Sequence, residues 1–141
     1  MKYLQNLSMA CAICLSVLTA AYAADLKVIA NPSVGASSVS ADELKNVFLA
    51  TKTSLSDGSH VEPVLEKDGP THEAFVREYL GKTDAALQTY YRSLVFTGKA
   101  SMPKTLGADA DVVAYVARTK GAIGYVGAGA STAGVKILEV K

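Results

Sequence analysis

A nine-residue segment near the C-terminus, 119–127, constrains the fold of this chain more than any other. It contains a helix stop, a short apolar strand and a turn flanked by glycine. Lys120 closes the preceding helix with a cation, which the helix dipole favours, and Gly121 is free to adopt the left-handed conformation just past the helix end. Residues 123–126 are typical of a buried strand, in which Gly124 marks a point where no side chain fits. The segment therefore predicts a helix that leads directly into a buried strand.

Apolar runs and helical patterns alternate along the rest of the chain. Polar loops are expected at 33–38 and 99–107. The predicted strands are 26–30, 61–65, 123–126 and 135–140, and the predicted helices are 40–48, 68–80, 84 to about 94, and 109–118. This alternation indicates one α/β domain, with a mixed sheet covered by helices.

The first predicted helix has a clear start. Ser40 and Glu43 have the spacing of a capping box, in which each side chain bonds the other residue's backbone N–H. Asp68 is expected to cap the second helix, and Gly81 to end it. The apolar faces of these elements predict one core made of Val28, Ile29, Leu44, Val47, Phe48, Val64, Phe75, Leu80, Val113, Val116, Ile123 and Tyr125.

The N-terminus has the pattern of a cleaved export signal. Lys2 precedes the apolar run 7–21, and Ala21-Tyr22-Ala23 forms a small-x-small cleavage site. The run is shorter than the roughly 20 residues that a membrane-spanning helix needs. We therefore expect a signal peptide at 1–23, a mature domain at 24–141 that is not inserted in the membrane, and a periplasmic location.

Charge and cysteine content exclude several classes of function. The chain has 14 basic and 13 acidic side chains, so removal of Lys2 leaves 13 of each. Balanced charge without a basic stripe argues against a nucleic-acid partner. Cys11 and Cys14 both lie in the expected signal, which leaves no disulfide, thiol nucleophile or cysteine-bound metal in the mature chain.

Catalytic and cofactor motifs are not expected either. His60 and His72 are 12 positions apart without metal-ligand spacing, and we expect both to be exposed. No Gly-x-Ser-x-Gly sequence occurs, and too little chain follows Gly127-Ala128-Gly129 for a dinucleotide-binding unit. The tyrosines 79, 90 and 91 are expected to pack in the core with their hydroxyls at the surface. The chain is thus predicted to be neither an enzyme nor a cofactor carrier.

Three blocks carry a resemblance to a known family. The blocks are 40–49 followed by Asp57-Gly58, the segment Asp68-Gly69-Pro70-Thr71 leading to Phe75, and 121–127. Together they resemble phosphate-type periplasmic substrate-binding proteins, in the short form that has a single lobe. The resemblance implies one lobe of a type II periplasmic-binding-protein-like fold, a possible phosphate ligand and a membrane transporter as partner.

The phosphate loop departs from that family's pattern. An alignment on Thr71 and Phe75 places Leu65 at the family's arginine, Gly69 at its serine and Pro70 at its second glycine. Leucine makes no ionic bond to phosphate, and proline has no N–H to donate. The residues left as candidates for an anion site are Ser37, Ser38, Lys67, Asp68, Gly69, Thr71 and His72.

Two functions stay open at this point. The first is an exported solute-binding module that binds an oxyanion such as phosphate weakly at most, at the start of the second helix. The second is an accessory module that has lost the phosphate pocket and binds an envelope protein instead. The retained Thr71 favours the first, whereas Leu65, Gly69 and Pro70 favour the second.

Overall fold

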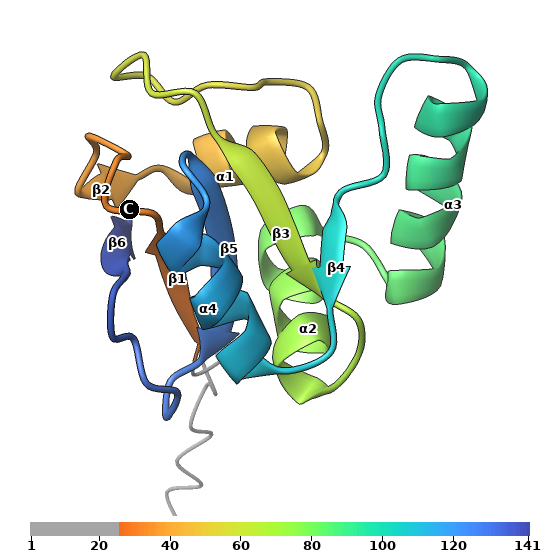
Figure 1. The fold of residues 1–141 in the computed structure, drawn as a ribbon. Helices are drawn as coiled ribbons and strands as arrows, with labels where there is room; N and C mark the ends of the chain where they lie inside the picture. The colour runs from red at the N-terminus through yellow and green to blue at the C-terminus, as the bar shows by residue number, and fades with distance from the viewer. Residues whose placement is uncertain (1–25) are drawn as a thin grey trace, which may run out of the picture.

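The computed structural model describes residues 26–141, which form one mixed six-stranded sheet with helices on both faces (Figure 1). The expected signal peptide lies outside the described residues. The strands are β1 (Leu26–Ala30), β2 (Ser38–Val39), β3 (Glu62–Glu66), β4 (Lys104–Leu106), β5 (Ala122–Gly127) and β6 (Lys136–Val140). The helices are α1 (Ala41–Phe48), α2 (Pro70–Phe75), α3 (Asp84–Phe96) and α4 (Asp109–Arg118), and a π-helical turn, η1 (Val76–Leu80), continues α2.

The strand order is β2-β6-β1-β5-β3-β4. Strand β1 runs antiparallel to both of its neighbours, β5 and β6. Strand β3 runs parallel to β5 and β4, and β2 runs parallel to β6. As a result, β3, β4 and β5 all end at the same edge of the sheet.

The two faces of the sheet have separate cores. Helix α4 covers one face, and α1, α2 and η1 cover the other, as Figure 1 shows with α4 in front and α1 and α2 behind. Gly124 lets α4 approach the sheet, because a Cβ there would meet a methyl group of Val112 at 3.1 Å. The expectation that no side chain fits at Gly124 is confirmed.

Aromatic rings fill the core under α1 and α2. The rings of Phe75 and Tyr125 stack with centroids 3.9 Å apart, and Phe48 meets Phe75 edge-on at 4.8 Å. Of the twelve predicted core residues, all are buried except Val113, which is half-buried and packs at the border of the core under α4. The predicted core is confirmed in all but that residue.

Helix α1 begins as predicted. Ser40 Oγ accepts from the backbone N–H of Glu43 (3.1 Å), and Glu43 Oε2 accepts from the backbone N–H of Ser40 (2.9 Å). Glu43 Oε1 also accepts from the backbone N–H of Ser56 (2.8 Å). Hydrogen bonds from Ser56 and Ser40 lower the pKa of Glu43 to about 2. The capping box therefore also ties the loop at Ser56 to the helix start.

Several local predictions were wrong. The sheet has six strands because β2 and β4 pair inside segments expected to be loops. The N-cap of α2 is Gly69, with φ 98°, and Asp68 does not cap the helix. Gly81 does end this helical segment, at φ 63°.

The tyrosine hydroxyls also differ from expectation. Tyr91 donates to the carbonyl of Phe48 (2.5 Å) and Tyr90 donates to that of Leu49 (2.6 Å). These carbonyls belong to the last turn of α1 and would otherwise have no helical partner. The hydroxyls attach α3 to the end of α1 instead of facing water.

Candidate functional site

The start of α2 and the start of α4 meet at the edge where β3, β4 and β5 end. Strand β3 leads to α2 on one face, whereas β4 leads to α4 on the other. In open α/β sheets, ligands bind outside the carboxyl ends of strands at such a switch of faces. We call the residues gathered here the junction: Glu66, Asp68, Gly69, Thr71, Asp109 and Gly127.

The end of β5 brings the two helix starts together. The backbone N–H of Gly127 donates to Asp109 Oδ2 at 3.3 Å. A Cβ on Gly127 would lie 3.1 Å from that same oxygen and 3.4 Å from Thr71 Oγ1. Glycine at this position therefore allows both helices to approach the end of β5.

Glu66 is the most unusual residue of the junction. Its side chain is only 6% exposed, and its Oε1 atom is buried without a hydrogen-bond partner. Burial, reinforced by a hydrogen bond with Asp109 and by the charges of Asp109 and Asp68, raises the pKa of Glu66 from 4.5 to about 8. At neutral pH the Glu66 carboxyl therefore keeps its proton, which it shares with Asp109.

Strand alternation explains why Glu66, and not Leu65, faces the junction. Val64 packs in the core under α4, whereas Leu65 packs in the core on the opposite face and is only 2% exposed. Glu66 returns to the α4 side, next to Asp109. Leu65 thus cannot contribute to a ligand site, and an arginine placed there would be buried in the core.

A chain of hydrogen bonds supports the junction from below. The backbone N–H of Glu66 donates to the Tyr125 hydroxyl (3.1 Å), which lies 2.5 Å from His72 Nδ1, and His72 Nε2 lies 2.7 Å from Asp84 Oδ1. Burial raises the pKa of Tyr125, so its hydroxyl keeps a proton to donate. The hydroxyl donates to Nδ1, and the imidazole then donates from Nε2 to Asp84. The start of α3 is thereby linked to the end of β3.

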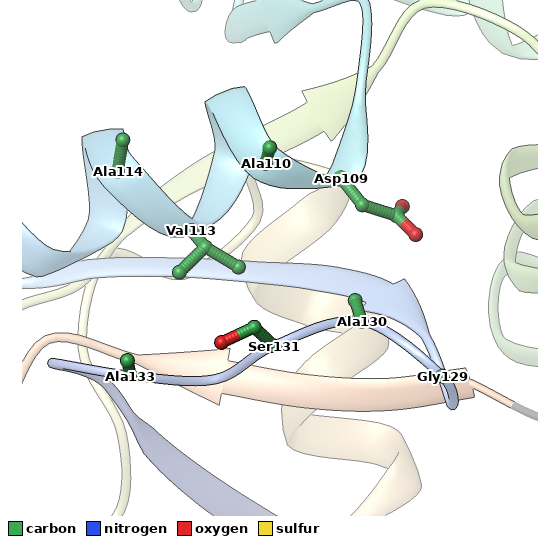
Figure 2. A pocket seen from close by; sticks show the side chains of 8 residues that line it. All are labelled: Asp109, Ala110, Val113, Ala114, Gly129, Ala130, Ser131 and Ala133. Atoms are coloured by element: carbon green, nitrogen blue, oxygen red, sulfur yellow. The ribbon is translucent and has the colours of Figure 1, made fainter.

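A groove adjoins the junction on the α4 side. It has a volume of about 540 Å³ and is lined by Asp109, Ala110, Val113, Ala114, Gly129, Ala130, Ser131 and Ala133. Figure 2 shows Asp109 at the end of the groove nearest the tip of β5, with Val113 pointing toward the segment that follows β5. Small apolar side chains make up most of the walls, and a carboxylate marks one end.

The structure brings together four of the seven predicted site residues. Lys67, Asp68, Gly69 and Thr71 all lie in the turn between β3 and α2 or at the start of α2. His72 was expected to be exposed, but it is 1% exposed and points into the core. The interpretation of His72 as an exposed residue was wrong, whereas His60 is exposed as expected.

The two predicted serines lie elsewhere. Ser37 is exposed, and Ser38 pairs with Glu139 at the opposite edge of the sheet. Strand β2 is four strand positions from β3, which corresponds to about 19 Å at the usual spacing of ~4.8 Å. Ser37 and Ser38 therefore do not join the start of α2.

Sequence reasoning missed the residues that give the junction its character. Asp109, Tyr125 and Asp84 were assigned to a strand or to helix starts, and Glu66 to the link between a strand and a helix, without a role in a site. The signal that was available was the order Val64-Leu65-Glu66. Glu66 lies two positions after the buried Val64 and therefore on the same face of the strand. A carboxylate at such a position, just before a turn, indicates a polar group that points into the structure.

Several solved structures have a fold similar to that of this chain. Three similar structures are an ABC-type phosphate transport receptor from Vibrio cholerae, a putative phosphate ABC transporter substrate-binding protein with bound phosphate from Clostridium perfringens, and PstS from Borrelia burgdorferi. Their TM-scores are 0.54, 0.62 and 0.61, at 12%, 16% and 13% sequence identity. The fold is therefore that of phosphate ABC transporter substrate-binding proteins, as the sequence resemblance predicted.

The chain corresponds to a single lobe of these proteins. The matches cover 82%, 82% and 83% of this chain, but only 46%, 44% and 47% of the respective solved chains. No family model and no curated protein matches the sequence. The chain thus spans less than half the length of the solved structures it resembles.

Proposed function

We propose that this chain is an exported solute-binding module, not an enzyme, whose ligand site is the junction together with the adjoining groove. The observation that carries the proposal is the position of the junction. It lies at the carboxyl edge of parallel strands, between two helix starts on opposite faces. The fold shared with phosphate ABC transporter substrate-binding proteins supports a binding role.

We further propose that inorganic phosphate binds weakly at most. Asp68 and Asp109 place acidic groups where an oxyanion would approach, and like charges repel, whereas the protonated Glu66 carboxyl adds no cation to offset them. Pro70 occupies the first turn of α2 without an N–H, and the N–H of Glu73 is already bonded to the carbonyl of Gly69 (3.0 Å). Lys67 is the cation nearest in sequence, and its exposed side chain is a single point charge.

Calorimetric titration of the purified protein with phosphate, and separately with sulfate, tests this proposal. We expect no saturable heat at ligand concentrations below about 1 mM, which corresponds to a binding free energy weaker than about −4 kcal/mol. A Glu66→Gln variant serves as a matched comparison, because it removes the ionisable group without changing its shape. Saturable micromolar binding of phosphate by the wild-type protein would contradict the proposal.

Export is the second part of the proposal. The N-terminal pattern described above supports cleavage after Ala23 and a periplasmic location. No helix within residues 26–141 is both long and apolar enough to cross a bilayer. Intact-mass analysis of the protein from its native host is expected to give a chain that begins at Ala24, and retention of Met1 would overturn this part.

A partner-binding role is the second candidate function, and the tip of α3 favours it. Phe96 is 93% exposed and its sequence neighbour Val95 is 44% exposed, and Met102, in the loop that follows α3, is 47% exposed. Figure 1 shows α3 standing beside the sheet, beyond β4. Large apolar side chains exposed near one another, as Val95 and Phe96 are, are typical of interaction sites. A membrane transporter or another envelope protein would bury them.

Site-specific photo-crosslinking in the native host tests the partner-binding role. A photoreactive residue at position 96 is expected to give a discrete adduct, whereas the same residue at the exposed Arg92 position, one turn earlier, is expected to give none. Equal labelling from both positions, or no adduct at position 96, would count against this role.

A further inference from the structure

The junction contains hydrogen-bond acceptors that lack donors. Oε1 of Glu66 is buried without a partner, and the bond that Asp109 Oδ2 accepts from the N–H of Gly127 is long, at 3.3 Å. A protonated Glu66 can donate one hydrogen bond to Asp109, but its carbonyl oxygen then still lacks a donor. A buried acceptor without a partner costs about 1–3 kcal/mol. A ligand with several N–H donors that displaced the hydrogen bond between Glu66 and Asp109 would satisfy both carboxyl groups.

The charge of the junction points to a cation. Among residues 26–141, no ion pair joins a lysine or arginine to Glu66, Asp68 or Asp109. Lys104 on β4 and Arg118 at the end of α4 both lie over the ring of Tyr115. Within the described residues, the acidic groups of the junction therefore have no cationic partner, and at neutral pH only the proton on Glu66 reduces their charge.

The apolar walls of the groove indicate that the ligand also has an apolar part. Its walls are Ala110, Val113, Ala114, Ala130 and Ala133, and its volume of about 540 Å³ lies within the usual range for small-molecule sites. Asp109 belongs both to the groove and to the junction, so a ligand can touch both at once (Figure 2). An apolar wall that ends at Asp109, which is hydrogen-bonded to Glu66, suits a short alkyl chain that ends in a charged nitrogen.

A metal ion fits these residues less well. Within residues 26–141, no three histidine, cysteine, aspartate or glutamate side chains are grouped so that they could hold a metal ion. Two carboxyl groups beside an apolar wall instead match the three N–H donors and short carbon stem of an alkylammonium ion.

We propose that the junction and the groove together bind a small organic cation, with a primary ammonium group between Glu66 and Asp109 and an aliphatic chain along α4. This inference rests on the proposed function only in placing the ligand at the junction. Binding requires Glu66 to give up its proton, so affinity increases with pH.

The pH dependence follows from the groups that face Glu66. These are Asp109 on α4, Asp68 in the turn before α2, and Tyr125 on β5 with His72 behind it. Because the pKa of Glu66 is about 8, the apparent affinity is expected to rise about tenfold per pH unit between pH 6 and 8. A ligand that bound without displacing the Glu66 proton would show no such slope.

The test uses n-butylammonium chloride as probe, titrated into the ¹⁵N-labelled full chain at pH 6, 7 and 8. We expect saturable shifts of the amide resonances of Glu66, Asp109 and Gly127–Gly129. Glu66→Gln and Asp109→Asn are each expected to weaken binding at least tenfold. Glu62→Gln, an exposed carboxylate at the other end of β3, is the matched control and is expected to bind as wild type.

Two further comparisons keep the proposal falsifiable. Ala114→Leu narrows the groove from an exposed helix position, and it is expected to weaken n-butylammonium at least tenfold even if Glu66→Gln does not fold. Uncharged n-butanol is expected to bind at least tenfold more weakly than n-butylammonium. Equal binding of the two, or shifts produced by Ca²⁺ but not by n-butylammonium, would overturn the inference.

The failure of this inference is distinguishable from that of the proposed function. Tight phosphate binding would overturn the proposed weak response to oxyanions. Absence of n-butylammonium binding, with phosphate also inactive, would overturn only the cation assignment.

Discussion

At the scale of single residues, the structure depends on a few buried aromatic and acidic side chains. Tyr125 stacks on Phe75 through its ring and bonds the Glu66 backbone and His72 through its hydroxyl. A single residue thereby links the apolar core to the polar junction. The contacts of Tyr125 therefore contribute to the stability of the domain and also position the Glu66 backbone at the junction.

Removal of Phe75 is expected to be costly. Phe75→Ala leaves a cavity beside Tyr125 and Phe48, and the free energy of unfolding is expected to fall by about 3–5 kcal/mol. Urea denaturation measures the change. Phe96→Ala is the matched control, because Phe96 is 93% exposed and its loss is expected to cost less than about 0.5 kcal/mol. A cost below about 1 kcal/mol for Phe75→Ala would contradict the packing described above.

Glu66 is expected to make stability depend on pH in a direction unusual for a carboxylate. Its pKa is raised on folding from 4.5 to about 8, so the folded state binds the proton more tightly than the unfolded state does. The contribution of Glu66 to stability is therefore fully present below pH 4.5 and is lost as the pH rises through 8. Urea midpoints measured from pH 5 to 9 are expected to fall in the wild-type protein. The fall should be smaller in Glu66→Gln, and identical slopes would show that Glu66 is not the titrating group.

At the scale of secondary-structure elements, local signals predicted the longer elements and missed the shortest. Helix α4 has the predicted bounds, and α1 follows its capping box, because both patterns are contained within one helix. Strands β2 and β4 have only two and three residues, too few for alternation to be recognised. They exist because distant partners, β6 and β3, hold them.

The capping box of α1 gives a prediction at this scale. Ser40→Ala removes the acceptor for the N–H of Glu43 and is expected to cost about 1 kcal/mol in unfolding free energy. Because the pKa of Glu43 is lowered to about 2, its contribution is present above its ordinary pKa of 4.5 and is lost as the pH falls through 2. Thermal unfolding of Glu43→Gln at pH 6 and pH 2 tests the sign. A larger effect of this substitution at pH 2 than at pH 6 would contradict it.

At the scale of the whole molecule, the topology of the sheet brings the residues of the candidate site together. Glu66 and Asp109 are 43 positions apart in the sequence, and only the arrangement β4-β3-β5 with α2 and α4 on opposite faces brings them together. Sequence reasoning found the turn at Lys67–Thr71 because a family motif marks it. It could not find the acidic partner on α4, since Asp109 alone has the pattern of an ordinary helix start.

The lobe also differs in extent from the solved structures it resembles. The chain spans less than half of each of them, and the groove along α4 opens to solvent within the described residues. A ligand held on one lobe is bound by fewer groups than one enclosed between two, so modest affinity is expected. Under the proposal, the acidic residues of the junction select ligands by charge, which requires no second lobe.

The central claim is that the junction binds solutes and discriminates against phosphate. The most direct measurement is a pair of ¹⁵N-resolved titrations of the same protein sample at pH 8, one with phosphate and one with n-butylammonium, at equal concentrations up to about 1 mM. The account predicts saturable shifts for n-butylammonium, centred on Glu66, Asp109 and Gly127, and no saturable shifts for phosphate. Saturable phosphate shifts at Lys67–Thr71, with no response to n-butylammonium, would contradict it.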